Sequence, residues 1–249
     1  MKGVDISHYQ KGLAIQQIKD AGNDFAIIKL TESSYMIDGE AFRYYREAYT
    51  MGFPVGCYCY SHATTAEQAR REAEFLLKTI NGFPMPCGVF LDVEEPKQLG
   101  LGYEQIMAVL TTWCDAIKAA GYIPGVYSSE YNLWAKVSPE DLPDTLVWVA
   151  HYGKEPDVAC DLWQSSDSSS VPGYSGKVDT NEVRSKRFER MVEAGFATDS
   201  NVGGNDHAGE ANNMIGDISG ALVLLADYIR TDEFRQAFLK YLRREEIAE

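Results

Sequence analysis

The first half of the chain alternates five short apolar segments with helix-like segments, and this alternation limits the possible folds more than any other feature. Strand-like segments occupy residues 3–7, 25–30, 54–60, 88–94 and 123–128, and helical patterns occupy 13–21, 40–51, 66–80 and 103–120. Strands that alternate with helices across short turns form a parallel sheet with the helices outside. We therefore expect an α/β fold.

The alternation of strands with helices stops after residue 128. Residues 146–150, 161–164 and 177–180 also resemble strands, but their connections are too short, or too rich in Ser, Gly and Pro, for full crossover helices. Eight strands with good helices between only the first five predict an incomplete (β/α) barrel. We expect this barrel to occupy residues 1–196.

The tail has a different pattern from the barrel. Residues 197–213 are rich in Gly, Asn and Asp and predict a linker. Apolar residues then recur at three-and-four spacing, which predicts a helical hairpin over 214–249. This appendage is expected to dock on the barrel, to form a homo-oligomer, or to belong to a wall-targeting module. The sequence leaves all three open.

Charge and hydropathy exclude several classes of partner. The 249-residue chain has a net charge of −14 and a pI near 4.7, which argues against nucleic acid or an anionic membrane surface. Its longest apolar run, residues 221–226, is far too short for membrane insertion. Met1 leads directly into a strand-like segment, so we expect synthesis in the cytoplasm without a signal peptide. A substrate outside the cytoplasm would then be met only after release.

The five cysteines are odd in number and form no Cys-x-x-Cys pair. They therefore predict buried, small apolar side chains made in a reducing compartment, and no disulfide or zinc framework.

Gly88–Pro96 holds the most informative carboxylates. Alternation in this strand places Asp92 and Glu94 on one face and Val89, Leu91 and Val93 on the other. Adjacent carboxylates disfavour a second ionisation, so one should keep its proton near neutral pH beside an anionic neighbour. Glycoside hydrolysis uses such an acid and carboxylate. An acidic strand end facing solvent is the plainer alternative.

The carboxyl ends of barrel strands carry the chemistry of such folds. Here they combine carboxylates with aromatic and amide side chains, a mixture that suits sugar binding. The expected site residues are Asp5, Glu32, Tyr58, Tyr60, Asp92, Glu94, Tyr127, Trp148, Tyr152, Trp163, Gln164 and Asp179.

These segments, in this order, resemble glycoside hydrolase family 25, the N-acetylmuramidase lysozymes of phage endolysins and bacterial autolysins. The resemblance covers roughly residues 1–190. Its motifs are Val4-Asp5-Ile6-Ser7, Ile27 to Ser33, Pro54 to Tyr60, Phe90-Leu91-Asp92-Val93-Glu94, Gly125 to Ser128, Leu146 to Ala150 with Tyr152, Leu162 to Ser166, and Val178-Asp179-Thr180-Asn181. Cys59 departs from the family pattern, in which many members have a histidine after the strand tyrosine. This departure removes no catalytic acid.

The resemblance implies an incomplete TIM-like (β/α)5(β)3 barrel with a C-terminal helical appendage. It implies cleavage of the β-1,4 bond between N-acetylmuramic acid and N-acetylglucosamine in bacterial peptidoglycan. With no signal peptide expected, a phage or prophage endolysin is the leading hypothesis. Glu94 matches the acid that protonates the leaving oxygen, and Asp92 matches the carboxylate that stabilises the reacting sugar. Asp5 and Asp179 match the remaining acids. Either the substrate's 2-acetamido group or water attacks the anomeric carbon.

Other functions remain to be weighed against this one. A chitinase-like hydrolase also uses Asp-x-Glu after a barrel strand, and a wall-binding module without catalysis is a non-enzymatic alternative. His8, His62 and His151 follow strand ends, but they lack the spacing of a metal motif. We expect no metal and no cofactor. Lys29, inside a strand, is expected to pair with a carboxylate in the barrel or to contact the cleft.

Overall fold

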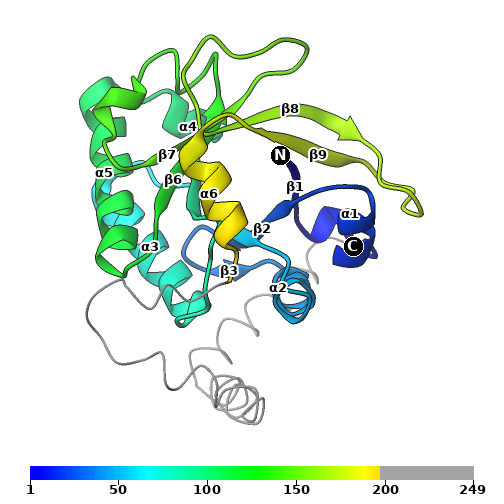
Figure 1. Cartoon of the computed structure of the whole chain (residues 1–249). Coiled ribbons are helices and arrows are strands. Elements are labelled where there is room, and N and C mark those ends of the chain that lie inside the picture. Colours follow the sequence, from blue (N-terminus) through cyan, green and yellow to red (C-terminus); the bar gives the residue numbers. More distant parts are fainter. Residues whose placement is uncertain (197–249) are drawn as a thin grey trace, which may run out of the picture. The chain divides into compact units, whose positions relative to one another are not determined.

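The computed structural model describes residues 1–196 and gives an α/β fold around a closed barrel (Figure 1). The predicted linker at 197–213 and the predicted hairpin at 214–249 lie outside the described residues. None of the helices in residues 1–196 is long and apolar enough to cross a bilayer.

Eight strands close the barrel, because the sheet order β1-β9-β8-β7-β6-β5-β4-β2 is completed by pairing of β1 with β2. The short strand β3 adds to the outer side of β2 in an antiparallel pair. The strands are β1 Lys2–Ile6, β2 Phe25–Glu32, β3 Met36–Ile37, β4 Val55–Tyr60, β5 Val89–Asp92, β6 Pro124–Ser129, β7 Leu146–Ala150, β8 Leu162–Ser169 and β9 Val178–Val183. All eight predicted strands are present, and β3 is an addition.

One strand of the barrel runs in the opposite direction to the other seven. The pairings from β1 through β2 and β4 to β8 are parallel, whereas β9 is antiparallel to both β8 and β1. The amino end of β9 therefore lies at the rim where the neighbouring strands have their carboxyl ends. This reversal is absent from the sequence-based expectation, and it determines how one site residue reaches the cleft.

The long helices begin and end close to their predicted positions. The helices are α1 Ile15–Asp20, α2 Ala41–Thr50, α3 Ala66–Ile80, α4 Pro96–Leu99, α5 Tyr103–Ala119 and α6 Lys186–Ala194, with 3-10 turns η1 His8–Gln10 and η2 Pro139–Asp141. In α3, the Thr65 side chain accepts from the Gln68 amide at 3.3 Å, and Asn81 ends the helix with φ 47°.

Two apolar layers result from the strand alternation. Val89, Leu91 and Val93 are buried in the cluster that includes the helices, whereas Phe90 packs inside the barrel with Trp148. The prediction of opposite faces for β5 is confirmed. Four of the five cysteines are buried as predicted, whereas Cys160 is partly exposed.

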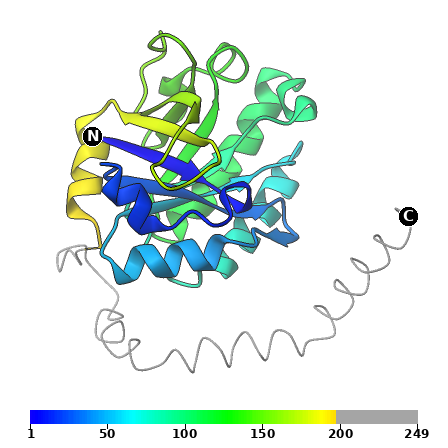
Figure 2. The same cartoon turned by 90° about the vertical axis from the view of Figure 1, so that its right-hand side faces the viewer.

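Helix α6 covers the end of the barrel at which β1 begins (Figure 2). Its Phe188 is fully buried against Phe25, with ring centroids 5.3 Å apart, and Val192 joins the same interior cluster. Because this end is filled by packed side chains, the cleft opens at the opposite rim.

Candidate active site

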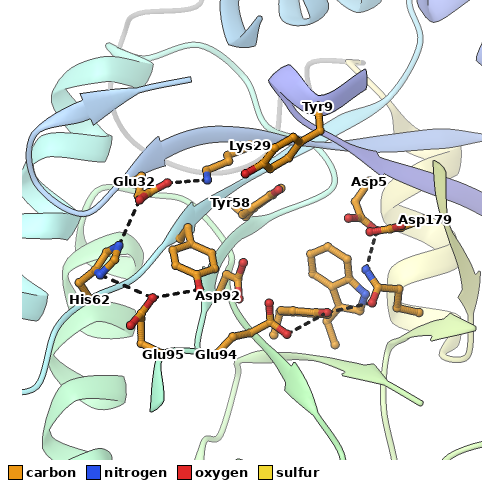
Figure 3. Close-up of a pocket in the computed structure, with 14 residues that line it drawn as sticks. Asp5, Tyr9, Lys29, Glu32, Tyr58, His62, Asp92, Glu94, Glu95 and Asp179 are labelled. Carbon is orange, nitrogen blue, oxygen red and sulfur yellow. Dashed lines mark hydrogen bonds and ion pairs between the residues drawn. The ribbon is translucent and has the colours of Figure 1, made fainter. Parts of the chain in front are cut away.

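A cleft of about 390 Å³ opens at the carboxyl ends of the parallel strands (Figure 3). Ten of the twelve expected site residues line it, and the exceptions are Tyr152 and Trp163. The cleft is lined by Asp5, Tyr9, Lys29, Glu32, Tyr58, Tyr60, His62, Asp92, Glu94, Glu95, Tyr127, Trp148, Gln164 and Asp179. The residues that were grouped from the sequence because they lie at strand ends therefore also lie together in the folded protein.

Asp92 and Glu94 lie at the centre of this cleft (Figure 3). Asp92 ends β5 and is only 5% exposed. Its Oδ1 is buried without a hydrogen-bond partner among the described residues. Burial, followed by the charge of Glu94, raises the pKa of Asp92 well above its ordinary value. Burial also raises the pKa of Glu94, and the charge of Asp179 adds to that effect.

These directions correct one part of the sequence argument. Asp92 was expected to be a permanent anion that keeps Glu94 protonated, but burial disfavours the charged form of both groups. The unliganded pair therefore holds protons more tightly than two solvated carboxyls would, and its titration belongs to the pair. The expectation that a carboxylic acid is retained at this position agrees with the direction of both shifts.

Asp5 and Asp179 face each other across the β1–β9 pairing, where they occupy the same register position. Burial raises the pKa of Asp5 to about 6, although hydrogen bonds from Asn181 and Gln164 oppose the shift. Burial and the charge of Asp5 raise the pKa of Asp179 to about 7. Asp179 was predicted at a carboxyl end, but it is the second residue of β9. It reaches the cleft because that strand is reversed.

Gln164 connects this acidic pair to the aromatic wall. Its Nε2 donates to Asp5 Oδ2 at 2.9 Å, and its Oε1 accepts from the Tyr127 and Tyr152 hydroxyls at 2.8 Å each. Tyr152 thus supports the site through Gln164 without lining the cleft. Tyr127 also lies 3.5 Å from Glu94 Oε1, a weaker contact.

Asn181 is a fully buried member of the site that the predicted residue set omits. Its Nδ2 donates to Asp5 Oδ2 at 2.8 Å, and its Oδ1 accepts from Trp148 Nε1 at 2.8 Å. Asn181 therefore orients Asp5 and the indole together. The family-like motif contains this residue, but the sequence does not show that it faces inward. Trp163 is directed elsewhere, since its Nε1 donates to the His151 carbonyl at 2.7 Å.

The other end of the cleft contains a chain of ion pairs. Lys29 Nζ lies 2.8 Å from Glu32 Oε2, and Glu32 Oε1 lies 3.2 Å from His62 Nε2. His62 Nδ1 is 3.8 Å from Glu95 Oε1, which also accepts from the Tyr60 hydroxyl at 3.1 Å. Lys29 thus pairs with a carboxylate, as expected, and also lines the cleft. His62 and Glu95 were not selected as substrate-binding residues because they follow the strands.

Cys59 does not line the cleft. It is fully buried within the cluster between barrel and helices, so its departure from the family pattern affects the outer layer.

The three histidines near strand ends each lie beside a carboxylate. His8 pairs with Asp38, His62 with Glu32, and His151 with Glu130. Within residues 1–196, no group of three or more His, Cys, Asp or Glu side chains is arranged to hold a metal ion.

The comparisons with known proteins agree on one family. The model of Glycosyl hydrolases family 25 matches residues 4–174. The autolytic lysozyme of Clostridium acetobutylicum is 30% identical over 187 residues, which cover 73% of this chain and 55% of that protein. The lysozyme of Lactococcus phage mv1 is 27% identical over 192 residues, covering 68% of this chain and 91% of that protein.

A solved structure shows the same fold. The CTP1L endolysin superposes with a TM-score of 0.69 at 22% identity, over 78% of this chain and 69% of that one. The present chain spans 55% of the length of the autolytic lysozyme.

Proposed function

The chain belongs to glycosyl hydrolase family 25, and from this membership and the cleft we propose that it is a peptidoglycan hydrolase of the N-acetylmuramidase type. Its bond would be the β-1,4 link between N-acetylmuramic acid and N-acetylglucosamine. The observation that carries the proposal is the central Asp92–Glu94 pair in a cleft shared with Asp5 and Asp179. The lysozyme relatives support the substrate class.

We assign the proton donor to Glu94. Its raised pKa favours the protonated form that can protonate the leaving glycosidic oxygen. It is also less buried than Asp92, since it is one of the partly exposed residues of the cleft. Separation of the sugars then leaves positive character at the anomeric carbon, for which nearby carboxylates are the natural stabilisers.

Asp92 suits the substrate's 2-acetamido group. A buried carboxyl oxygen without a partner in residues 1–196 is an unfavourable arrangement until a donor reaches it. The acetamido N–H is a donor that a substrate of this class carries beside the reacting carbon. We therefore propose that Asp92 accepts a hydrogen bond from the acetamido N–H while the acetamido carbonyl oxygen attacks the anomeric carbon. This is the substrate-assisted route.

Turbidity clearing of purified bacterial walls tests the proposal. Wild type should clear the suspension, and Glu94→Gln should lose at least a hundredfold in rate, since general acid catalysis typically contributes about 10²–10⁴-fold. Glu74→Gln, at an exposed position of α3 that does not line the cleft, serves as a control with full activity. Equal clearing by wild type and Glu94→Gln would refute the assignment of the acid.

Analysis of new reducing ends identifies the bond. A muramidase leaves N-acetylmuramic acid at the reducing end of its products. New ends of N-acetylglucosamine, or cleavage of chitin without cleavage of walls, would instead establish the chitinase-like alternative.

The finer organisation is also a proposal. Connections up to β6 contain helices, whereas β7, β8 and β9 follow one another without an α-helix, which supports the (β/α)5(β)3 description. We propose a catalytic domain over 1–196 and an appendage over 214–249 that docks or self-associates. Solution mass of the full chain and of a chain lacking 199–249 tests the latter. The phage lysozyme relative supports a phage or prophage origin and action on the wall after release.

A further inference from the structure

Tyr9 is an exposed aromatic residue at the cleft that the catalytic scheme does not use. Tyr9 is 77% exposed, yet it lines the same cleft as Asp92 and Glu94. A single exposed aromatic residue needs no functional explanation. The argument therefore depends on how this ring is held and what it faces.

Hydrogen bonds fix the turn η1 that carries Tyr9. Ser7 caps the turn, and the Gln10 side chain accepts from the Ser7 amide at 3.0 Å. The Gln10 carbonyl accepts from the Tyr44 hydroxyl on α2 at 2.6 Å. The Tyr174 hydroxyl, from the β8–β9 connection, lies 3.4 Å from the Tyr9 carbonyl. The backbone beneath the ring is thus connected both to α2 and to the β8–β9 connection.

His8 supports the ring of Tyr9 directly. The two ring centroids are 4.1 Å apart at an interplanar angle of 37°. His8 is itself anchored, because its Nδ1 lies 2.5 Å from Asp38 Oδ2 and its amide donates to the same oxygen at 3.1 Å. The Asp38 side chain is completely buried. A buried carboxylate therefore orders an exposed aromatic pair, although neither ring gains much burial from that order.

The ring lies on the side of the cleft that carries Lys29 and Tyr58, across from Glu94 (Figure 3). Little of its surface is removed from water, so an ordered aromatic surface remains available to a ligand in the cleft. The C–H face of a pyranose is apolar and flat enough to stack on such a ring. Preorganisation lowers the entropy lost when the contact forms.

We propose that Tyr9 is a sugar-stacking platform, a binding position for one pyranose of the glycan strand next to the central carboxylates. This inference rests on the proposed glycan-hydrolase function and assigns a substrate-positioning residue to it. Tyr9 acts through the face of its ring, and its hydroxyl is not required. Because Tyr9 is not part of the acid–carboxylate pair, it should contribute to binding of substrate and transition state alike.

Three variants separate this role from a structural one. Tyr9→Ala removes the ring, Tyr9→Phe keeps it, and Tyr35→Ala removes a tyrosine that is 69% exposed and is not one of the cleft-lining residues. With soluble, peptide-free glycan strands as substrate, Tyr9→Ala should raise KM roughly tenfold with little change in kcat, as expected for loss of one stacking contact. Tyr9→Phe and Tyr35→Ala should stay within about twofold of wild type, and all three should keep the wild-type melting temperature.

Binding measured without turnover keeps this test separate from that of the catalytic proposal. Glu94→Gln and Glu94→Gln/Tyr9→Ala are titrated with the same glycan strands, and the double variant should bind roughly tenfold more weakly. If wild type cleaves no wall while this tenfold difference persists, the hydrolase proposal fails and the platform stands. Unchanged binding and KM in the Tyr9→Ala proteins, or an equal loss in Tyr35→Ala, would overturn the platform.

Discussion

Gln164 donates its side-chain amide to Asp5 across 2.9 Å, which joins β8 to β1 inside the barrel although the two residues are 159 positions apart. The same side chain accepts from two tyrosine hydroxyls. Because both the nitrogen and the oxygen of this amide have partners in the site, Gln164 couples the acidic pair to the aromatic wall.

Gln164→Ala should therefore affect both stability and ionisation. We expect a loss of roughly 1–3 kcal/mol in the free energy of unfolding, because buried partners lose their hydrogen bonds. The pKa of Asp5 should rise above about 6, since one of the bonds that lowers it is removed. Denaturant melts and carboxyl NMR titration measure the two effects. Exposed Gln16→Ala is the control, and an unshifted Asp5 titration would contradict the coupling.

Asp179→Asn should change how stability depends on pH. Asp179 has a pKa of about 7 in the folded protein and about 3.8 unfolded, so the native state binds the proton more tightly. The associated stability is complete below pH 3.8 and is lost as pH rises through 7. The variant has no carboxyl group at this position and so lacks this loss. Between pH 4 and pH 8 its free energy of unfolding should rise by about 1 kcal/mol relative to that of wild type, after allowance for solvent screening.

Thermal melts across this pH range provide the measurement. Asp115→Asn on the exposed side of α5 is the matched control and should follow the wild-type curve. A variant curve parallel to wild type would show that Asp179 titrates equally in both states.

Lys29→Met should shift the acidic limb of the profile of kcat/KM against pH to higher pH. The positive charge of Lys29 lowers the pKa of Asp92 and also that of Glu32. Without this charge the pKa of Asp92 rises further, so the ionised form required by its proposed role appears at higher pH. Profiles of kcat/KM against pH should show the limb moving to higher pH. Lys118→Met, which removes a surface partner of Asp144, should leave the limb unchanged.

Phe188→Ala should destabilise the barrel without changing its chemistry. Phe188 is fully buried against Phe25 at the end opposite the cleft, so truncation should cost about 3–5 kcal/mol. Activity at temperatures where the variant is folded should match wild type. Exposed Glu193→Ala on the same helix is the control. A large fall in kcat with unchanged stability would contradict the separation of the two ends.

The sequence predicted the barrel because period-two strands and period-3.6 helices alternate clearly. It also predicted the central carboxylates, since strand alternation alone places Asp92 opposite the apolar face of β5. The direction of β9 was missed, because the alternation within one strand does not show whether it runs parallel or antiparallel to its neighbours. Asp179 lines the cleft as expected, although its assigned strand end was wrong.

The residues that escaped prediction are those positioned by tertiary contacts. Tyr9 depends on Asp38, which lies 29 residues later, and Glu95 depends on His62 from another loop. Asn181 faces inward only because β9 pairs with β1. Local periodicity carries no information about such pairs, so these positions became visible only when the loops were in place.

The reversed final strand makes the acidic cleft one of the last parts of the barrel to be completed during synthesis. Asp5 is among the first residues made and Asp179 among the last of the barrel, and each is held by the other's strand. A ribosome that has not yet released the last of these strands therefore carries a polypeptide that lacks one member of the Asp5–Asp179 pair. The full set of cleft carboxylates comes together only when the two ends of the barrel sequence join.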